Sequence, residues 1–241
     1  MKTLEHSSLG YPKSHPNITV AVRKPLTESR SDDVSMCIET VSGKLVNPTC
    51  PDASSIDIND IAWSLSRIPR FAGHTITGLS FNVAQHSVYV SELVEEILTD
   101  SDVADKAGFD RFSIVEMNGI NSVLIKALIH DAHEAYTGDI PSPIKRIPEL
   151  NTTLKLIEGR LDHAIFTALE LSEVTDSEQH LIKYCDKLAQ AIEGYQFMPS
   201  RGLNWNLPKT DLIRLQSFPQ PMAPLDSYKA FIKRFNYLRE R

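Results

Sequence analysis

Apolar residues recur at helical spacing along most of the chain. One stripe repeats at i, i+4, i+7 and i+11, and it consists of His86, Val90, Leu93 and Ile97. Ser80 or Asn82 is suited to cap the helix that carries this stripe. A lone histidine on a core-facing stripe is more often a hydrogen-bonded core residue than a ligand, so His86 by itself indicates little about function.

Five further helices follow from the same periodicity and from capping and breaking residues. Asp57 caps the first, and Pro69 ends it because proline disfavours helical geometry in the residue before it. Asn121 caps another helix, which continues to Tyr136 and is ended by Gly138. The remaining patterns predict helices over 152–171, 176–197 and 227–239.

Strand patterns are confined to the N-terminal part of the chain. Residues 18–22 form a short β-like stretch, and residues 37–48 predict a hairpin with Ser42 and Gly43 at its turn. Residues 1–36 otherwise show no sustained periodicity and are interpreted as an extension, which leaves 37–241 as one domain. Since alternating βαβ units are absent from the pattern, the expected fold is all-α, a helical bundle with a small β-hairpin near the N-terminus.

Length, charge and cysteine usage narrow the function classes. A chain of 241 residues is long enough for one full-sized core, and its formal net charge of −6 disfavours a general duplex-DNA coat, which needs a basic face. No apolar run approaches the roughly 20 residues that cross a bilayer, and no signal core opens the chain. The three cysteines are widely spaced, which disfavours a disulfide framework. We therefore expect a cytoplasmic protein with no membrane partner.

Several familiar catalytic signatures are missing from the sequence. It contains no Gly-x-Ser-x-Gly, no phosphate-binding P-loop and no Gly-x-Gly-x-x-Gly. His133 and Glu134 begin a possible His-Glu-x-x-His motif, but Thr137 stands at its fifth position. The second zinc histidine is therefore missing, and a metalloprotease is disfavoured.

Imidazoles and carboxylates on three predicted helices remain as candidate chemistry. They are His86, His130, Asp131 and Asp186. Nitrogen and oxygen ligands on facing helices suit a divalent transition metal. Adjacent helical residues point about 100° apart, so only one of His130 and Asp131 needs to face inward. Asp186, beside Lys187, equally fits an exposed helical position.

In combination and in order, these residues resemble the metal set of the HD-domain phosphohydrolases. The surrounding segments are more specific, with VAQHS at 83–87, HDAHEAYTGDIPSPIK at 130–145, and Lys183 three residues before Asp186. They are similar to the deoxynucleotidase branch, which includes bacterial 5′-deoxynucleotidases and short phage dATP triphosphohydrolases. RFAGH at 70–74 resembles a sub-branch with an Arg-Phe-x-Gly-His element. The similarity runs from about Cys37 to the C-terminal helix.

The resemblance implies a role for each matching residue. The metal ligands that the resemblance implies are His86, His130, Asp131 and Asp186. The acids that it implies are Glu134, which orients or deprotonates the attacking water, and Asp139, which protonates the leaving oxygen or contacts the sugar. Its phosphate-binding cations are Arg70, Lys145 and Lys183. The expected walls of the base and sugar pocket are Phe71, Ile76 and Pro143.

The implied activity is hydrolysis of a deoxynucleotide with one divalent metal, which is Mn, Co, Zn, Fe or Mg. The Arg-Phe-x-Gly-His element and the spacing of Lys145 and Lys183 favour a dATP-type triphosphohydrolase that releases deoxynucleoside and triphosphate. The alternatives are a 5′-deoxynucleotidase acting on monophosphates and a non-catalytic nucleotide-binding module. The resemblance also implies a homo-oligomer, located in the host cytoplasm if a phage encodes it.

Overall fold

The protein is described by a computed structural model that covers residues 34–116, 119–205 and 219–241. The predicted stretch at 18–22 and most of the predicted extension lie outside these residues. The chain divides into two compact units, Met1–Ser35 and Met36–Arg241, and the features below belong to the second. In the part of the chain that is described, no helix is long and apolar enough to span a membrane.

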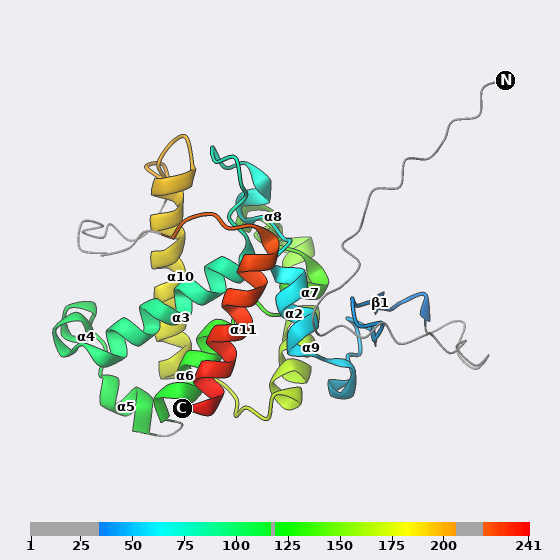
Figure 1. The fold of residues 1–241 in the computed structure, drawn as a ribbon, viewed down its shortest axis with the longest axis horizontal. Coiled ribbons are helices and arrows are strands. Elements are labelled where there is room, and N and C mark those ends of the chain that lie inside the picture. The colour runs from blue at the N-terminus through cyan, green and yellow to red at the C-terminus, as the bar shows by residue number, and fades with distance from the viewer. Residues whose placement is uncertain (1–33, 117–118, 206–218) are drawn as a thin grey trace. The chain divides into compact units, whose positions relative to one another are not determined.

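The second unit is a helical bundle with one small antiparallel sheet (Figure 1). Its strands and short 3-10 helices are β1 (Ile38–Glu39), β2 (Leu45–Val46), η1 (Ala53–Ser55) and η2 (Arg70–Gly73). Its α-helices are α2 (Ile58–Leu65), α3 (Val83–Thr99), α4 (Ser101–Ala107), α5 (Arg111–Glu116), α6 (Gly119–Leu128), α7 (Glu134–Thr137), α8 (Ser142–Lys145), α9 (Pro148–Ala168), α10 (Asp176–Phe197) and α11 (Pro224–Glu240). The expected all-α fold with an N-terminal hairpin is confirmed.

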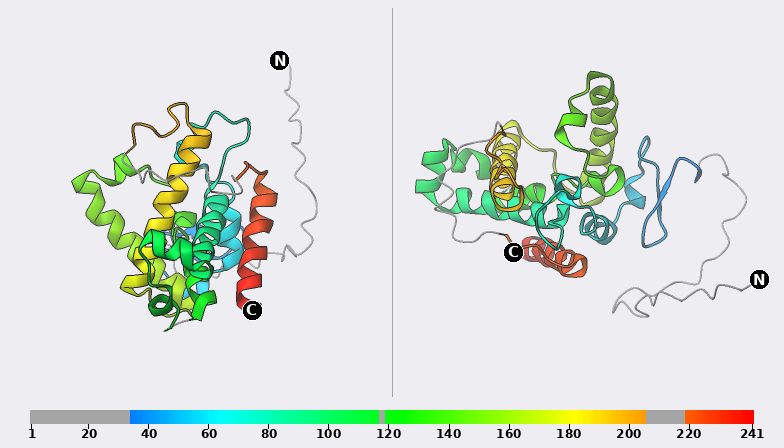
Figure 2. Two further views of the ribbon diagram at one scale, coloured as in Figure 1. Left: turned by 90° about the vertical axis from the view of Figure 1, so that its left-hand side faces the viewer. Right: turned by 90° about the horizontal axis from the view of Figure 1, so that it is seen from above.

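Helix α3 is the centre of the bundle. It packs against α6, α10 and α11, and the last two lie on different sides of it (Figure 2). The side chain of Asn82 caps α3 by accepting a hydrogen bond from the backbone N–H of Gln85. The predicted stripe is confirmed, since each of its four residues is buried, and His86 has no exposed surface. The core thus surrounds a buried imidazole.

Capping and turn residues fix several boundaries as expected. The hairpin pairs Ile38 with Val46, and Gly43 adopts a φ of 85° at its turn. Asp57 caps α2, and its side chain accepts from the backbone N–H of Asn59. Thr175 opens α10 with a capping box, so that this helix covers 176–197 as predicted.

The predicted helix over 121–136 is wrong in extent. The helix begins at Gly119 and ends at Leu128, and a series of turns leads to the separate short helix α7. Within these turns Ala132 N–H donates to the Ile129 carbonyl at 2.9 Å, and Glu134 N–H donates to the Asp131 carbonyl at 3.0 Å. Such three-residue spans are tighter than an α-helix. Periodicity missed the break because the apolar residues keep helical spacing through it.

Sequence patterns also misplaced the first residues of two helices and missed three short helices. Helix α9 begins at Pro148, four residues before the predicted start at 152, and α11 begins at Pro224 instead of 227. Proline fits the first helical turn because its missing N–H has no partner there in any case. Helices α4, α5 and α8 are too short for apolar periodicity to indicate them.

A buried ion pair joins α6 to the start of α10. Lys126 Nζ lies 2.9 Å from Glu178 Oε2 and 3.0 Å from Oε1, and both side chains are fully buried. The same ammonium donates to the Glu173 carbonyl at 3.1 Å. Because a buried charge without its partner is costly, the pair is expected to hold the two helices together.

We expect Glu178→Ala to lower the free energy of unfolding by about 3–5 kcal/mol, since the Lys126 ammonium would stay buried without its carboxylate. Urea unfolding followed by circular dichroism measures this change. The exposed neighbour provides a control, because Gln179→Ala should change stability by less than about 0.5 kcal/mol. A Lys126→Met/Glu178→Met double variant should recover much of the loss. Equal effects of the Glu178 and Gln179 variants would contradict the assignment.

Candidate metal centre

The buried histidine of α3 points its ring toward two carboxylates. His86 Nδ1 donates to Glu193 Oε1 of α10 at 2.7 Å. This bond fixes the ring, so that Nε2 lies 3.2 Å from Asp186 Oδ1 and 3.7 Å from Asp131 Oδ2. Among the described residues, His86 Nε2 has no hydrogen-bond partner. His86 therefore presents a buried ring nitrogen to the centre of the bundle.

The break between α6 and α7 presents both residues of the His130–Asp131 doublet to the same point. His130 Nδ1 donates to the Ala127 carbonyl at 2.9 Å, which leaves Nε2 free to face the carboxylates. That atom lies 3.3 Å from Asp131 Oδ2 and 3.9 Å from Asp186 Oδ1. On a continuous helix the two side chains would diverge, so the turn at 129–133 is what brings them together.

The four predicted ligands have the spacing of a metal site. The donor atoms of His86, His130 and Asp186 lie within 4.8 Å of one another, and Asp131 lies beside them. Ligands bound at about 2.1 Å in tetrahedral geometry lie about 3.4 Å apart, which is close to the distances found here. Both histidines donate Nδ1–H to a fixed acceptor and leave Nε2 without a partner, as metal-binding histidines do. The residues present fit one divalent cation.

The charges at this point favour a bound cation. Burial and the Arg70 charge lower the pKa of His86, but Glu193 and Asp186 outweigh them and raise it to about 10. Burial raises the pKa of Asp131, but His130, His86 and Arg70 bring it well below the usual range. The carboxylates thus stay ionised and attract positive charge, which a divalent metal supplies in place of protons.

The acid at the start of α7 is almost completely enclosed. Glu134 is 2% exposed, its Oε1 lies 3.4 Å from Lys145 Nζ, and its Oε2 has no hydrogen-bond partner within the described ranges. Burial and the charges of Asp131 and Asp139 raise the pKa of Glu134 to about 8, against the opposing effect of Lys145. A carboxyl with such a pKa exchanges a proton readily near neutral pH.

A buried arginine connects the metal group to the acids. Arg70 is 8% exposed, with Nη1 at 3.5 Å from Asp139 Oδ2 and Nε at 3.5 Å from Glu193 Oε2. Burial lowers the pKa of Arg70, but the charges of Glu193 and Asp139 raise it overall, so the guanidinium stays charged. The structure therefore brings Arg70, Lys145 and Asp139 close to the group formed by the predicted ligands and Glu134.

The turn after Arg70 is strained and is held by aromatic packing. Phe71 and Ala72 have φ values of 55° and 51°, which non-glycine residues rarely adopt. The Phe71 ring packs on Trp205 with centroids 5.5 Å apart. Trp205 in turn covers Gly194 of α10, where an added Cβ would lie 2.5 Å from the indole. Neither Trp205 nor Gly194 was identified from the sequence, which contains no local pattern that links them to Arg70.

The remaining predicted site residues lie at the surface. Lys183 is exposed one turn before Asp186 on α10 and, within the part of the chain that is described, forms no ion pair. Ile76 and Pro143 are also exposed, and no contact joins them to the metal group among the described residues. Their roles as a phosphate contact and as pocket walls stay predictions.

Three carboxylates near the group were missed by sequence reasoning. They are Glu158, Asp162 and Glu193. A signal existed for Glu193, since it follows Asp186 by seven residues and two helical turns place both on one face. Glu158 and Asp162 are four residues apart on α9, and both face His133, the residue that begins the incomplete His-Glu-x-x-His motif.

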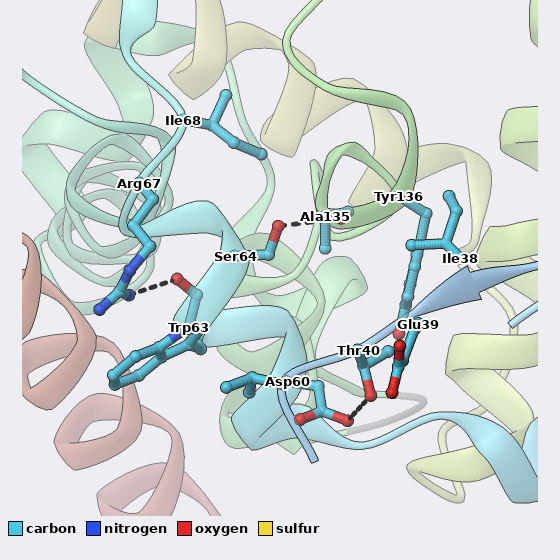
Figure 3. Close-up of a pocket in the computed structure, with 11 residues that line it drawn as sticks. Ile38, Glu39, Thr40, Asp60, Trp63, Ser64, Arg67, Ile68, Ala135 and Tyr136 are labelled. Carbon is cyan, nitrogen blue, oxygen red and sulfur yellow. Dashed lines mark hydrogen bonds between the residues drawn. The ribbon is translucent and has the colours of Figure 1, made fainter. Parts of the chain in front are cut away.

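A separate pocket of about 340 Å³ lies between the hairpin, α2 and α7 (Figure 3). Trp63 and Tyr136 contribute aromatic surface to it, and Asp60 accepts a 2.7 Å hydrogen bond from Thr40 Oγ1. Ser64 Oγ donates to the Ala135 carbonyl at 2.9 Å, which ties α2 to the helix that carries Glu134. None of the predicted ligands or phosphate-binding residues lines this pocket, so it is distinct from the metal group.

This chain is similar to several known proteins. A family model described as "5'-deoxynucleotidase YfbR-like" matches residues 61–200. The uncharacterised protein YfdR of Escherichia coli is 33% identical over 207 residues, which cover 84% of this chain and 96% of that protein. An uncharacterised protein of Rhodobacter capsulatus is 26% identical over 65% of this chain and 70% of its own length. The solved structure of the cyanophage S-2L HD phosphohydrolase DatZ, bound to dA and one catalytic Zn²⁺ ion, has 17% identity and a TM-score of 0.42, covering 77% of this chain and 99% of that one.

Proposed function

Because the chain belongs to the YfbR-like 5′-deoxynucleotidase family of HD-domain phosphohydrolases, we propose that it releases orthophosphate from deoxynucleoside 5′-monophosphates. Family membership makes the chain a metal-dependent phosphohydrolase, and this favours an enzyme over the non-catalytic module that the sequence left open. The observation that carries the proposal is the convergence of His86, His130, Asp131 and Asp186 next to the buried acid Glu134.

The four converging side chains are proposed to hold the catalytic cation. His86 and His130 supply Nε2, and Asp131 and Asp186 supply carboxylate oxygens. A divalent metal bound there supplies Lewis-acid activation of a water and stabilises negative charge on the phosphoryl group. Imidazole and carboxylate ligands accept Mn, Fe, Co and Zn, so the identity of the metal is decided by add-back experiments.

Glu134 is proposed to accept the proton of the attacking water. Its Oε2 is buried and has no hydrogen-bond partner in the described part of the chain, whereas Oε1 is held by Lys145 at 3.4 Å. One oxygen is therefore fixed and the other is available to a water, which is the geometry that a general base needs. Asp139 is proposed to protonate the leaving 5′-oxygen, because burial raises the pKa of this carboxyl and favours its protonated form.

Arg70 and Lys145 are proposed to bind the phosphate. The Arg70 guanidinium is held between Asp139 and Glu193, and Lys145 lies beside Glu134, so both cations border the metal group. A phosphate monoester carries about two negative charges at neutral pH. Both cations together with one divalent metal supply positive charge for this small dianion, which supports a monophosphate as the first candidate substrate.

A dATP-type triphosphohydrolase is the second candidate. Lys183 is exposed on the same helix as Asp186 and is not engaged by a carboxylate among the described residues. It is therefore available to the β- and γ-phosphates of a longer substrate. Attack at the same α-phosphorus would then release triphosphate in place of orthophosphate, without a change in the metal group.

Phosphorus NMR of the products tests the proposal. Purified, metal-stripped protein is incubated with dAMP and separately with dATP, after addition of Mn, Co, Zn, Fe or Mg. We expect orthophosphate from dAMP. Triphosphate from dATP with no reaction of dAMP would replace the proposal by the second candidate. No product from either substrate with any metal, while an Asp186→Asn control behaves identically, would overturn deoxynucleotide hydrolysis at this site.

A further inference from the structure

His133 repeats the arrangement of the two histidines in the metal group. It is 7% exposed, and its Nδ1 donates to Asp162 Oδ1 at 2.9 Å. Its Nε2 is buried and has no hydrogen-bond partner among the residues that the structure describes. A carboxylate that fixes Nδ1–H and leaves Nε2 facing other carboxylates is the arrangement found around metal-binding histidines. We propose that Asp131, His133 and the neighbouring glutamates form a second divalent-cation site.

The donor atoms of this second site lie close enough to share one ion. Those of Asp131, His133 and Glu134 lie within 4.8 Å of one another, and Glu158 Oε1 is 3.7 Å from His133 Nε2. Asp131 also faces the first site, since its Oδ2 is 3.3 Å from His130 Nε2. A carboxylate between two such groups can bridge two ions, which in two-metal sites lie about 3.5–4 Å apart.

The charge of the region supports a second cation. Seven carboxylates are linked through the contacts described above, and they belong to Asp131, Glu134, Asp139, Glu158, Asp162, Asp186 and Glu193. Only two permanently cationic side chains, Arg70 and Lys145, lie among these acids in the described ranges. The acids thus outnumber the cationic side chains, which favours bound positive charge at this point.

Lys145 competes for the same acids. Its Nζ lies 3.4 Å from Glu134 Oε1 and 3.2 Å from Glu158 Oε1, and its side chain is 30% exposed. The flexible stem allows the ammonium to leave these carboxylates for a substrate phosphate when an ion binds beside them. Removal of the ammonium should therefore strengthen ion binding at the second site and should not abolish it.

The donor atoms of the second site indicate which kind of cation it binds. One imidazole and two or three carboxylate oxygens suit a first-row divalent cation such as Mn²⁺. The inference uses the proposed function only in taking the substrate to be anionic. Its test counts bound ions, so it can fail while the phosphohydrolase is active and can succeed if the substrate is different.

Equilibrium dialysis of the full chain against MnCl₂, with metal determined by mass spectrometry, provides the test. We expect two Mn²⁺ ions per chain in the unmodified protein and one in His133→Gln. Asp162→Asn should keep both ions but weaken the second about 10- to 100-fold, because the orientation of the His133 ring is lost. Lys145→Met should bind the second ion more tightly. The exposed neighbour His163 provides the matched control, and His163→Gln should keep two ions.

One ion per chain at saturating MnCl₂ would overturn the second site, as would two ions of unchanged affinity in both His133→Gln and Asp162→Asn. Thermal unfolding of each variant identifies any that fail to fold. Asp162 is partly exposed, so we expect Asp162→Asn to fold. This variant therefore still tests the second site if His133→Gln is unstable.

Discussion

His130→Ala should remove the catalytic cation and the turnover together. His130 supplies one of two buried imidazole nitrogens that face the centre of the metal group, and its ring is aligned by the Ala127 carbonyl. An alanine leaves three ligands, and the carboxylates of Asp131 and Asp186 then lose the imidazole that faces them. We expect deoxynucleotide hydrolysis to fall to background and first-site metal to be lost, measured by phosphate release and by mass spectrometry of the dialysed protein.

A variant of a residue that only orients a ligand provides a control for the loss of a ligand itself. Glu193 contacts His86 Nδ1 at 2.7 Å and is not one of the four proposed ligands. Glu193→Gln keeps a hydrogen-bond acceptor but loses the charge shared with Arg70, so metal affinity should fall about 10- to 100-fold and activity should return at high metal concentration. Recovery of His130→Ala by added metal to the same degree would show that His130 is not a ligand.

The sequence was sufficient for the parts of the fold that depend on local signals. The stripe of α3, the caps Asn82 and Asp57 and the hairpin around Gly43 are each set by residues close to one another in the chain. Short helices such as α5 and the break between α6 and α7 depend on packing against distant elements. Propensity and periodicity contain no information on that packing.

The break at 129–133 is also where sequence reasoning about the site reached its limit. Helical geometry required only one residue of the His130–Asp131 doublet to face inward, and the resemblance to a family was needed to assign both. The structure explains the discrepancy, because three-residue turns replace the helix at this point. The doublet is thus an instance of local propensity giving way at the candidate metal centre.

Residues that support the site were harder to predict than residues that form it. Glu193 and Asp162 act by orienting His86 and His133, and this role needs only a carboxylate on a facing helix. No motif marks such a position, since its partner is distant in the chain. Trp205 is similar, because its contact with Gly194 and Phe71 depends on a close approach of backbones that the sequence does not indicate.

Glu134→Gln should abolish turnover while leaving the first cation in place. Glutamine has nearly the shape of glutamate, but it cannot accept the proton of the attacking water at neutral pH. We expect kcat to fall about a thousandfold, within the range that proton transfer by a positioned side chain contributes. The four ligands of the first ion are unchanged, so one molar equivalent of Mn²⁺ should bind to the variant as tightly as to the parent protein.

Lys145→Met is the matched comparison for Glu134→Gln. Lys145 Nζ lies 3.4 Å from Glu134 Oε1, and the substitution removes a positive charge where Glu134→Gln removes a carboxylate. If Lys145 binds substrate phosphate, KM should rise more than kcat falls, which is the reverse of the Glu134→Gln pattern. Steady-state kinetics of both variants at saturating metal distinguish the two roles.

A rise in KM with normal kcat in Glu134→Gln would place this residue in substrate binding. Loss of the first ion in the same variant would instead make Glu134 a ligand, and the proton acceptor would then have to be sought among the other acids near the metal group.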